Sequence, residues 1–180
     1  MNWKKTIFTI LLVTLAAGMA SAQYSGSGTT PIVATKAESL SISASGLVNY
    51  DLGSLAAQTL NISSYWNLKP SRNSVNVCVY MDPTTGVMKG TTGNSNVIDQ
   101  TMVQTKVGAG AWANINAGTG CGIATGVTVV KTYTLTTAAQ RNIASGSPNA
   151  DTVQVQLNAV PSTFEADTYT GTLTVVGYAQ

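Results

Sequence analysis

Apolar and polar residues alternate with a period of two along much of the chain. In residues 38–45, apolar side chains at positions 40, 42 and 44 alternate with serines. Residues 59–68, 74–81, 127–136 and 151–160 show related patterns, and residues 96–107 form a weaker one. Such alternation is typical of strands that bury one face. Only residues 137–144 have room for a helix, of one or two turns.

One more strand is predicted over residues 167–180. Tyr169, Leu173 and Val175 share one face with Gly171 between them, and threonines occupy the other face. Such a strand either lies inside a sheet or leaves an edge to which another chain can pair. We therefore expect its docking to complete the sheet.

The strand patterns together predict the fold class and the domain organisation. About seven strands, rich in threonine and valine and separated by turns, favour an all-β fold. We expect an immunoglobulin-like β-sandwich of about seven antiparallel strands in a single domain at residues 37–180. Residues 23–36, rich in glycine, serine and threonine, have the composition of a flexible N-terminal arm.

The first 22 residues read as a signal peptide. Lys4 and Lys5 precede an apolar segment at residues 6–17, and Ala20 and Ala22 form an A-x-A cleavage site. We therefore expect a mature chain that begins at Gln23 and is secreted to the periplasm, the cell surface or the medium. The apolar segment is shorter than the roughly 20 residues of a transmembrane helix, so no membrane span is expected.

The two cysteines are predicted to form one disulfide bond. Cys78 lies in the strand pattern of residues 74–81, and Cys121 lies in the glycine-rich residues 108–126, which are expected to form a loop. An even number of cysteines in an exported chain indicates disulfide bonding. The bond would fix the loop to a strand. Two buried free thiols are the alternative.

Composition excludes several classes of function. Charged residues make up 9% of the chain, against about 25% in an ordinary soluble protein. Because Lys4 and Lys5 leave with the signal, the mature chain is close to neutral, and without a basic patch it is not expected to bind nucleic acid. The chain contains no histidine, so the usual general base, zinc ligand and Ser-His triad are missing. We expect no enzymatic activity, no cofactor and no metal.

Two acidic residues and several aromatic residues remain as candidates for a site. Glu165 and Asp167 are the only acids close in sequence, and we interpret them as solvated turn residues rather than as an acid/base pair. Trp66 and Tyr169 are expected in the core. Trp112, isolated in the glycine-rich loop, is the candidate ligand contact. Three tyrosines are either ordinary sheet residues or, with Trp112, a sugar-stacking platform: Tyr65, Tyr80 and Tyr133.

The C-terminal pattern also resembles a known family ending. Tyr169, Leu173 and Val175 are similar in spacing to the G-x-Y-x-x-x-[LV]-x-V ending of pilin-like secreted bacterial subunits, in particular the spore coat protein U and archaic chaperone-usher group. The resemblance implies an immunoglobulin-like domain that lacks one strand and is completed by the N-terminal arm of the next subunit. It also implies a periplasmic chaperone as a partner.

These observations predict a non-enzymatic structural protein of the cell surface. It would be a pilus- or fimbria-like subunit that associates with itself or with other surface proteins through strand edges. The alternative is a monomeric extracellular module that binds a carbohydrate or a surface protein through its loops, with Trp112 as the contact. The candidate assembly residues lie in the arm and in the last strand: Ile32, Val33, Tyr169, Gly171, Leu173 and Val175.

Overall fold

The structure, a computed structural model, describes residues 34–46 and 56–180. The chain divides into Met1–Lys36 and a compact unit, Ala37–Gln180. The described residues form strands and turns without a helix. The predicted signal peptide and the candidate assembly residues Ile32 and Val33 lie outside the described residues.

The larger sheet of the compact unit has six antiparallel strands. Its order is β1-β2-β10-β6-β7, and β9 pairs with the end of β2. The strands are β1 (Ser39–Ser45), β2 (Gln58–Asn67), β6 (Val103–Lys106), β7 (Ala113–Asn114), β9 (Asn142–Ile143) and β10 (Asn149–Leu157).

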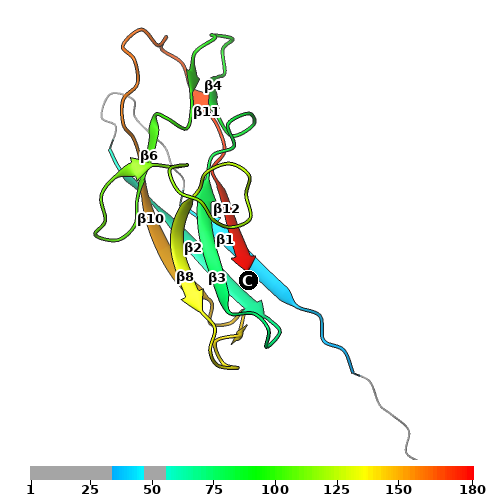
Figure 1. The fold of residues 1–180 in the computed structure, drawn as a ribbon. Helices are drawn as coiled ribbons and strands as arrows, with labels where there is room; N and C mark the ends of the chain where they lie inside the picture. Colours follow the sequence, from blue (N-terminus) through cyan, green and yellow to red (C-terminus); the bar gives the residue numbers. More distant parts are fainter. Residues whose placement is uncertain (1–33, 47–55) are drawn as a thin grey trace, which may run out of the picture. The chain divides into compact units, whose positions relative to one another are not determined.

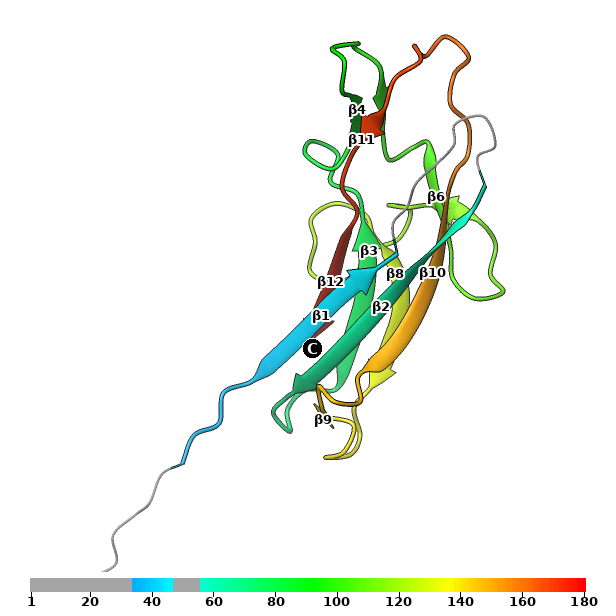
Figure 2. The same ribbon diagram turned by 180° about the vertical axis from the view of Figure 1, so that it is seen from behind.

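A second sheet has three antiparallel strands in the order β12-β3-β8 and packs against the larger one (Figures 1 and 2). Its strands are β3 (Ser74–Tyr80), β8 (Thr128–Thr134) and β12 (Thr174–Ala179). A small third sheet, in the order β11-β4-β5, lies at one end of the sandwich. It consists of β4 (Met88–Gly90), β5 (Val97–Ile98) and β11 (Tyr169–Thr170).

The predicted all-β sandwich of about seven antiparallel strands is confirmed. Among the described residues, the two facing sheets contain seven strands of four or more residues: β1, β2, β3, β6, β8, β10 and β12. The predicted strands at residues 38–45, 59–68, 74–81, 127–136 and 151–160 correspond to β1, β2, β3, β8 and β10.

The core forms where the alternating apolar residues of both sheets meet. Ile62 of β2, Val79 of β3 and Val155 of β10 are at most 2% exposed. Trp66, also 2% exposed, packs edge-on against Tyr133 with ring centroids 5.2 Å apart. Its Nε1–H donates to the carbonyl of Gln140 at 2.8 Å, which satisfies the one polar atom of the buried ring.

The prediction of a single strand over residues 96–107 is wrong. The chain turns at Asp99, whose carboxylate accepts from the backbone N–H of Thr101 at 2.8 Å. The carbonyl of Asp99 accepts from the N–H of Met102 at 3.1 Å. This Asx turn separates β5 from β6, which then join different sheets.

Two further segments differ from their predictions. Residues 137–144 do not form a helix; they form a turn in which the N–H of Arg141 donates to the carbonyl of Thr137 at 3.2 Å, followed by β9. The side chain of Gln140 accepts from the backbone N–H groups of Thr136 and Thr137 and closes the turn. The loop predicted at residues 108–126 contains the short strand β7.

The last segment is also not one continuous strand. Tyr169 pairs with Gly90 of β4, whereas Val175 pairs with Val79 of β3. Between them the N–H of Thr172 donates to the carbonyl of Gly86 at 2.9 Å. A Cβ at Gly171 would lie 2.7 Å from that same carbonyl, so the close approach requires glycine. The chain therefore leaves the small sheet at Gly171 and joins the second sheet at β12.

Candidate functional site

The predicted disulfide bond is confirmed. Cys78 in the middle strand of the second sheet is bonded to Cys121 with an S–S distance of 2.04 Å. Cys121 has a φ of 53°, and Gly122 beside it has a φ of 63°, a left-handed stretch that glycine favours. The ring of Tyr178 on β12 packs so closely on Gly122 that a Cβ there would lie 2.9 Å from it. The loop is thereby fixed across the outer face of the sheet, from β3 to β12.

The strands β1 and β12 are neighbours in space but belong to different sheets (Figure 2). In the described part of the chain, β12 pairs only with β3 and β1 pairs only with β2. The backbone edge of each strand that faces the other is therefore without a strand partner there. Such an edge is the usual point at which another extended segment joins a sheet.

At one end the gap between β1 and β12 is closed by side chains. Leu40 of β1 lies against Gly177 of β12, where an added Cβ would be 3.0 Å from the leucine Cδ2. Nearby, Arg72 Nη2 is 3.1 Å from Glu38 Oε2, and Arg72 Nη1 donates to the carbonyl of Ala179 at 3.5 Å. The hydrogen bond from Arg72 holds the pKa of Glu38 below its usual value, and the N–H of Lys69 adds to the effect.

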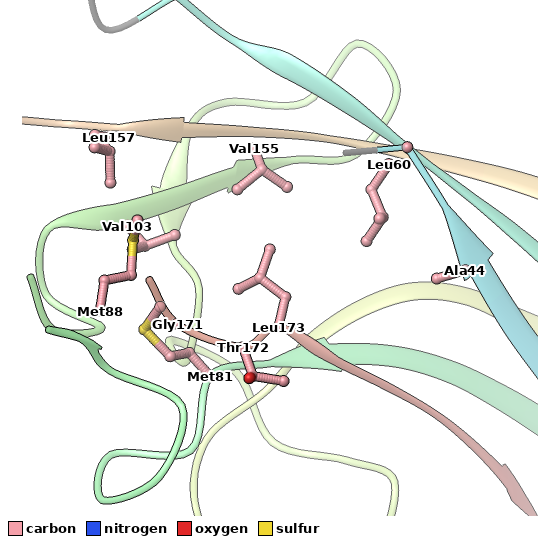
Figure 3. A pocket seen from close by; sticks show the side chains of 11 residues that line it. Ala44, Leu60, Met81, Met88, Val103, Val155, Leu157, Gly171, Thr172 and Leu173 are labelled. Carbon is pink, nitrogen blue, oxygen red and sulfur yellow. The ribbon is translucent and has the colours of Figure 1, made fainter. Parts of the chain in front are cut away.

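At the other end the gap opens into an apolar pocket of about 350 Å³. Ala44 and Gly46 border it from the β1 side, and Thr172 and Leu173 border it from the segment that leads into β12. Leu173 extends toward Val155 in the floor of the pocket (Figure 3). The rest of the lining comes from buried Leu60, Met81, Val103 and Leu157, half-buried Met88 and exposed Gly171.

The candidate assembly residues of the last segment fall at or near this pocket. Gly171 and Leu173 line it, and Val175 packs against the same core from β12. Tyr169 is 8% exposed and does not line the pocket. Its hydroxyl donates to the carbonyl of Glu165 at 2.9 Å, so it is a core residue of the small sheet.

The four aromatic residues considered as a platform are dispersed. Tyr133 packs inward on Trp66 and donates to Asp151 Oδ2 at 2.6 Å, and burial together with this hydrogen bond raises its pKa. Tyr80 packs against the buried disulfide. Tyr65 is 36% exposed on β2, and half-buried Trp112 lies on the β6–β7 connection.

Asp167, beside the small sheet, has a structural role. Asp167 accepts from the N–H of Thr92 at 3.0 Å and from the hydroxyl of Thr91 at 3.2 Å, and it also bonds the Asn94 amide. These bonds, that to the Thr92 N–H first, lower the pKa of the Asp167 carboxyl. Within residues 34–46 and 56–180, no group of three or more His, Cys, Asp or Glu residues is placed to hold a metal ion.

Comparison of the chain with protein-family models, characterised proteins and solved structures finds no match. The part of the chain that the structure describes contains no helix of the length and apolarity needed to cross a membrane. The pocket beside β12 is the feature that the sequence pattern missed. Its lining comes from many separate segments, and the only sequence signal was the apolar face of the last strand.

Proposed function

We propose that this chain is a non-enzymatic, exported structural protein of the cell surface that assembles through strand edges, in the manner of a pilus or fimbria subunit. The observation that carries the proposal is the edge of β12 that has no strand partner among residues 34–46 and 56–180, and that lies beside an apolar pocket open toward β1. An added strand in this gap would gain backbone hydrogen bonds along β12 and place alternate side chains over the pocket.

The pocket suits small apolar side chains from an extended segment. Leu173 and Val155 line the pocket, and Ala44 and Gly46 border it on the β1 side. The predicted arm, residues 23–36, contains Ile32 and Val33 next to Ala34. Burying one such side chain would contribute about 1.5–3 kcal/mol. The low charge of the chain leaves little repulsion between copies.

Chain length keeps Val33 of the same chain from the pocket, so a Val33 bound there would come from a second copy. Ala44 lies five residues along β1 from Ser39, or about 17 Å. Val33 precedes Ser39 by six residues, and reversing the chain direction takes at least about two of them. The four that remain span about 13 Å when extended, which is too short to bring Val33 of the same chain to the pocket.

The proposal is tested with the mature, disulfide-bonded chain from residue 23. Size-exclusion chromatography and electron microscopy compare it with a chain that lacks residues 23–36 and with Ala44→Arg. Ala44 is exposed and borders the pocket, so arginine there obstructs the groove at little cost to the core. We expect oligomers or filaments from the mature chain and single subunits from both variants.

Ser43→Arg is the matched control, because neighbouring residues of a strand point to opposite faces. It adds the same charge to the same strand and should leave assembly unchanged. A synthetic peptide of residues 23–36 should also raise the melting temperature of the chain that lacks the arm, by the usual linkage of binding to stability. Single subunits of equal stability from all four proteins would refute the proposal.

A further inference from the structure

The outer face of the larger sheet carries uncharged polar side chains across four strands. Because β2, β6 and β10 bury alternate residues, the residues between them point away from the core, and the β1 residues paired with those of β2 point the same way. The strand register aligns them in rows: Asn61 of β2 stands between Ser45 of β1 and Thr152 of β10. In another row, Gln156 Nε2 donates to Gln104 Oε1 at 3.1 Å.

This face is almost free of charge. The six strands of the sheet contain two charged residues, Asp151 and Lys106. Asp151 bonds Tyr133, whose ring packs on Trp66 in the sandwich interior, and Lys106 lies at the margin beside Trp112. The outward side chains are mainly hydroxyls and amides, which both donate and accept hydrogen bonds.

Two aromatic rings border the polar face. Tyr65 is 36% exposed, and it shares the outward side of β2 with Asn61. On the far margin, Trp112 directly precedes β7, and Lys106 Nζ lies 6.0 Å from the centre of the tryptophan ring. From strand rise and strand spacing, the two rings are about 25 Å apart.

We propose that this face is a binding surface for a neutral polysaccharide. Sugar hydroxyls need partners that donate and accept, and rows of hydroxyl and amide groups supply both without the cost of burying a charge. The apolar faces of sugar rings pack on aromatic rings, which exposed Tyr65 and half-buried Trp112 provide. A distance of about 25 Å between the rings suits an extended polymer rather than a single sugar. Within the six strands of this sheet, Lys106 is the one basic side chain that could attract an anionic polymer.

Retention of the mature chain on insoluble polysaccharides tests the proposal. The neutral probes are cellulose, xylan, mannan and chitin, and the anionic control is alginate gel. Tyr65→Ala and Trp112→Ala each remove one ring. Tyr178→Ala is the matched control, because Tyr178 is a similarly exposed tyrosine, at 41%, on the other sheet. Thr152→Glu places a charge in the middle of the face at an exposed position.

We expect the mature chain and Tyr178→Ala to bind at least one neutral polysaccharide and not alginate. Tyr65→Ala and Trp112→Ala should each bind about fivefold more weakly or worse. Thr152→Glu should weaken binding similarly while its melting temperature stays unchanged, which keeps the test valid if a ring variant fails to fold. If the mature chain bound none of the four neutral polysaccharides, the proposal would be overturned. Equal weakening by Tyr178→Ala, or variants that change oligomeric size instead of retention, would overturn it as well.

Discussion

Removal of the Cys78–Cys121 bond should cost a large part of the stability of the sandwich. The bond closes a loop between positions 43 residues apart. In the chain-entropy model a loop of that length contributes about 4 kcal/mol, by restricting the unfolded chain. A domain of this size is usually stable by about 5–15 kcal/mol. The variant with both cysteines changed to alanine should therefore fold but unfold at a clearly lower urea concentration.

Equilibrium urea unfolding measures this effect directly. The midpoint should fall, and the denaturant dependence of the free energy of unfolding should rise because the unlinked chain exposes more surface when it unfolds. The bond also holds the glycine-rich loop over buried Val127, so amide exchange in that loop should accelerate more than in β2. A stability loss below about 1 kcal/mol would contradict the entropic reasoning.

Three further substitutions test other parts of the fold by the same unfolding assay. Trp66→Ala should cost about 3–5 kcal/mol, because the side chain is 2% exposed in the core; a loss below about 1 kcal/mol would argue against that packing. Gly126→Ala should cost about 1–3 kcal/mol, since its Cβ would overlap the Asn116 carbonyl; Gly146→Ala, with open space around it, is the control. The folded-state pKa of Asp167 is lowered, so its stabilisation is present above pH about 4 and is lost as the pH falls further. Asp167→Asn should thus flatten the acid side of the stability profile, and identical profiles would contradict this role.

The sequence was informative wherever one face of a strand is buried. In β2, alternation of Leu60, Ile62 and Trp66 with polar residues follows directly from burial on one side. The prediction from alternation was wrong where a local turn or a long-range backbone contact interrupts the strand. Asp99 divides residues 96–107 because its side chain bonds the backbone two residues ahead. Gly171 divides the last segment because it packs on the backbone of Gly86, a residue distant in sequence.

The disulfide could be predicted from the sequence, whereas the pocket could not. With two cysteines a single pairing exists, so Cys78 and Cys121 could be assigned without geometry. The pocket could not be assigned, because neither Met81 nor Val103 has a neighbour in sequence that marks it as a lining residue. Their meeting depends on how the two sheets pack, which period-two alternation does not specify.

Because side chains alternate along β1, two neighbouring residues belong to the two different proposed surfaces. Ala44 borders the pocket beside β12, whereas Ser43 points to the polar outer face. Ala44→Arg should therefore abolish assembly and leave the intrinsic affinity of one subunit for a neutral polysaccharide intact. Ser43→Arg should leave assembly intact and weaken polysaccharide binding. Because an assembled fibre repeats the outer face, its retention should exceed that of single Ala44→Arg subunits through multivalency. If either arginine impaired both properties, the two surfaces would not be independent.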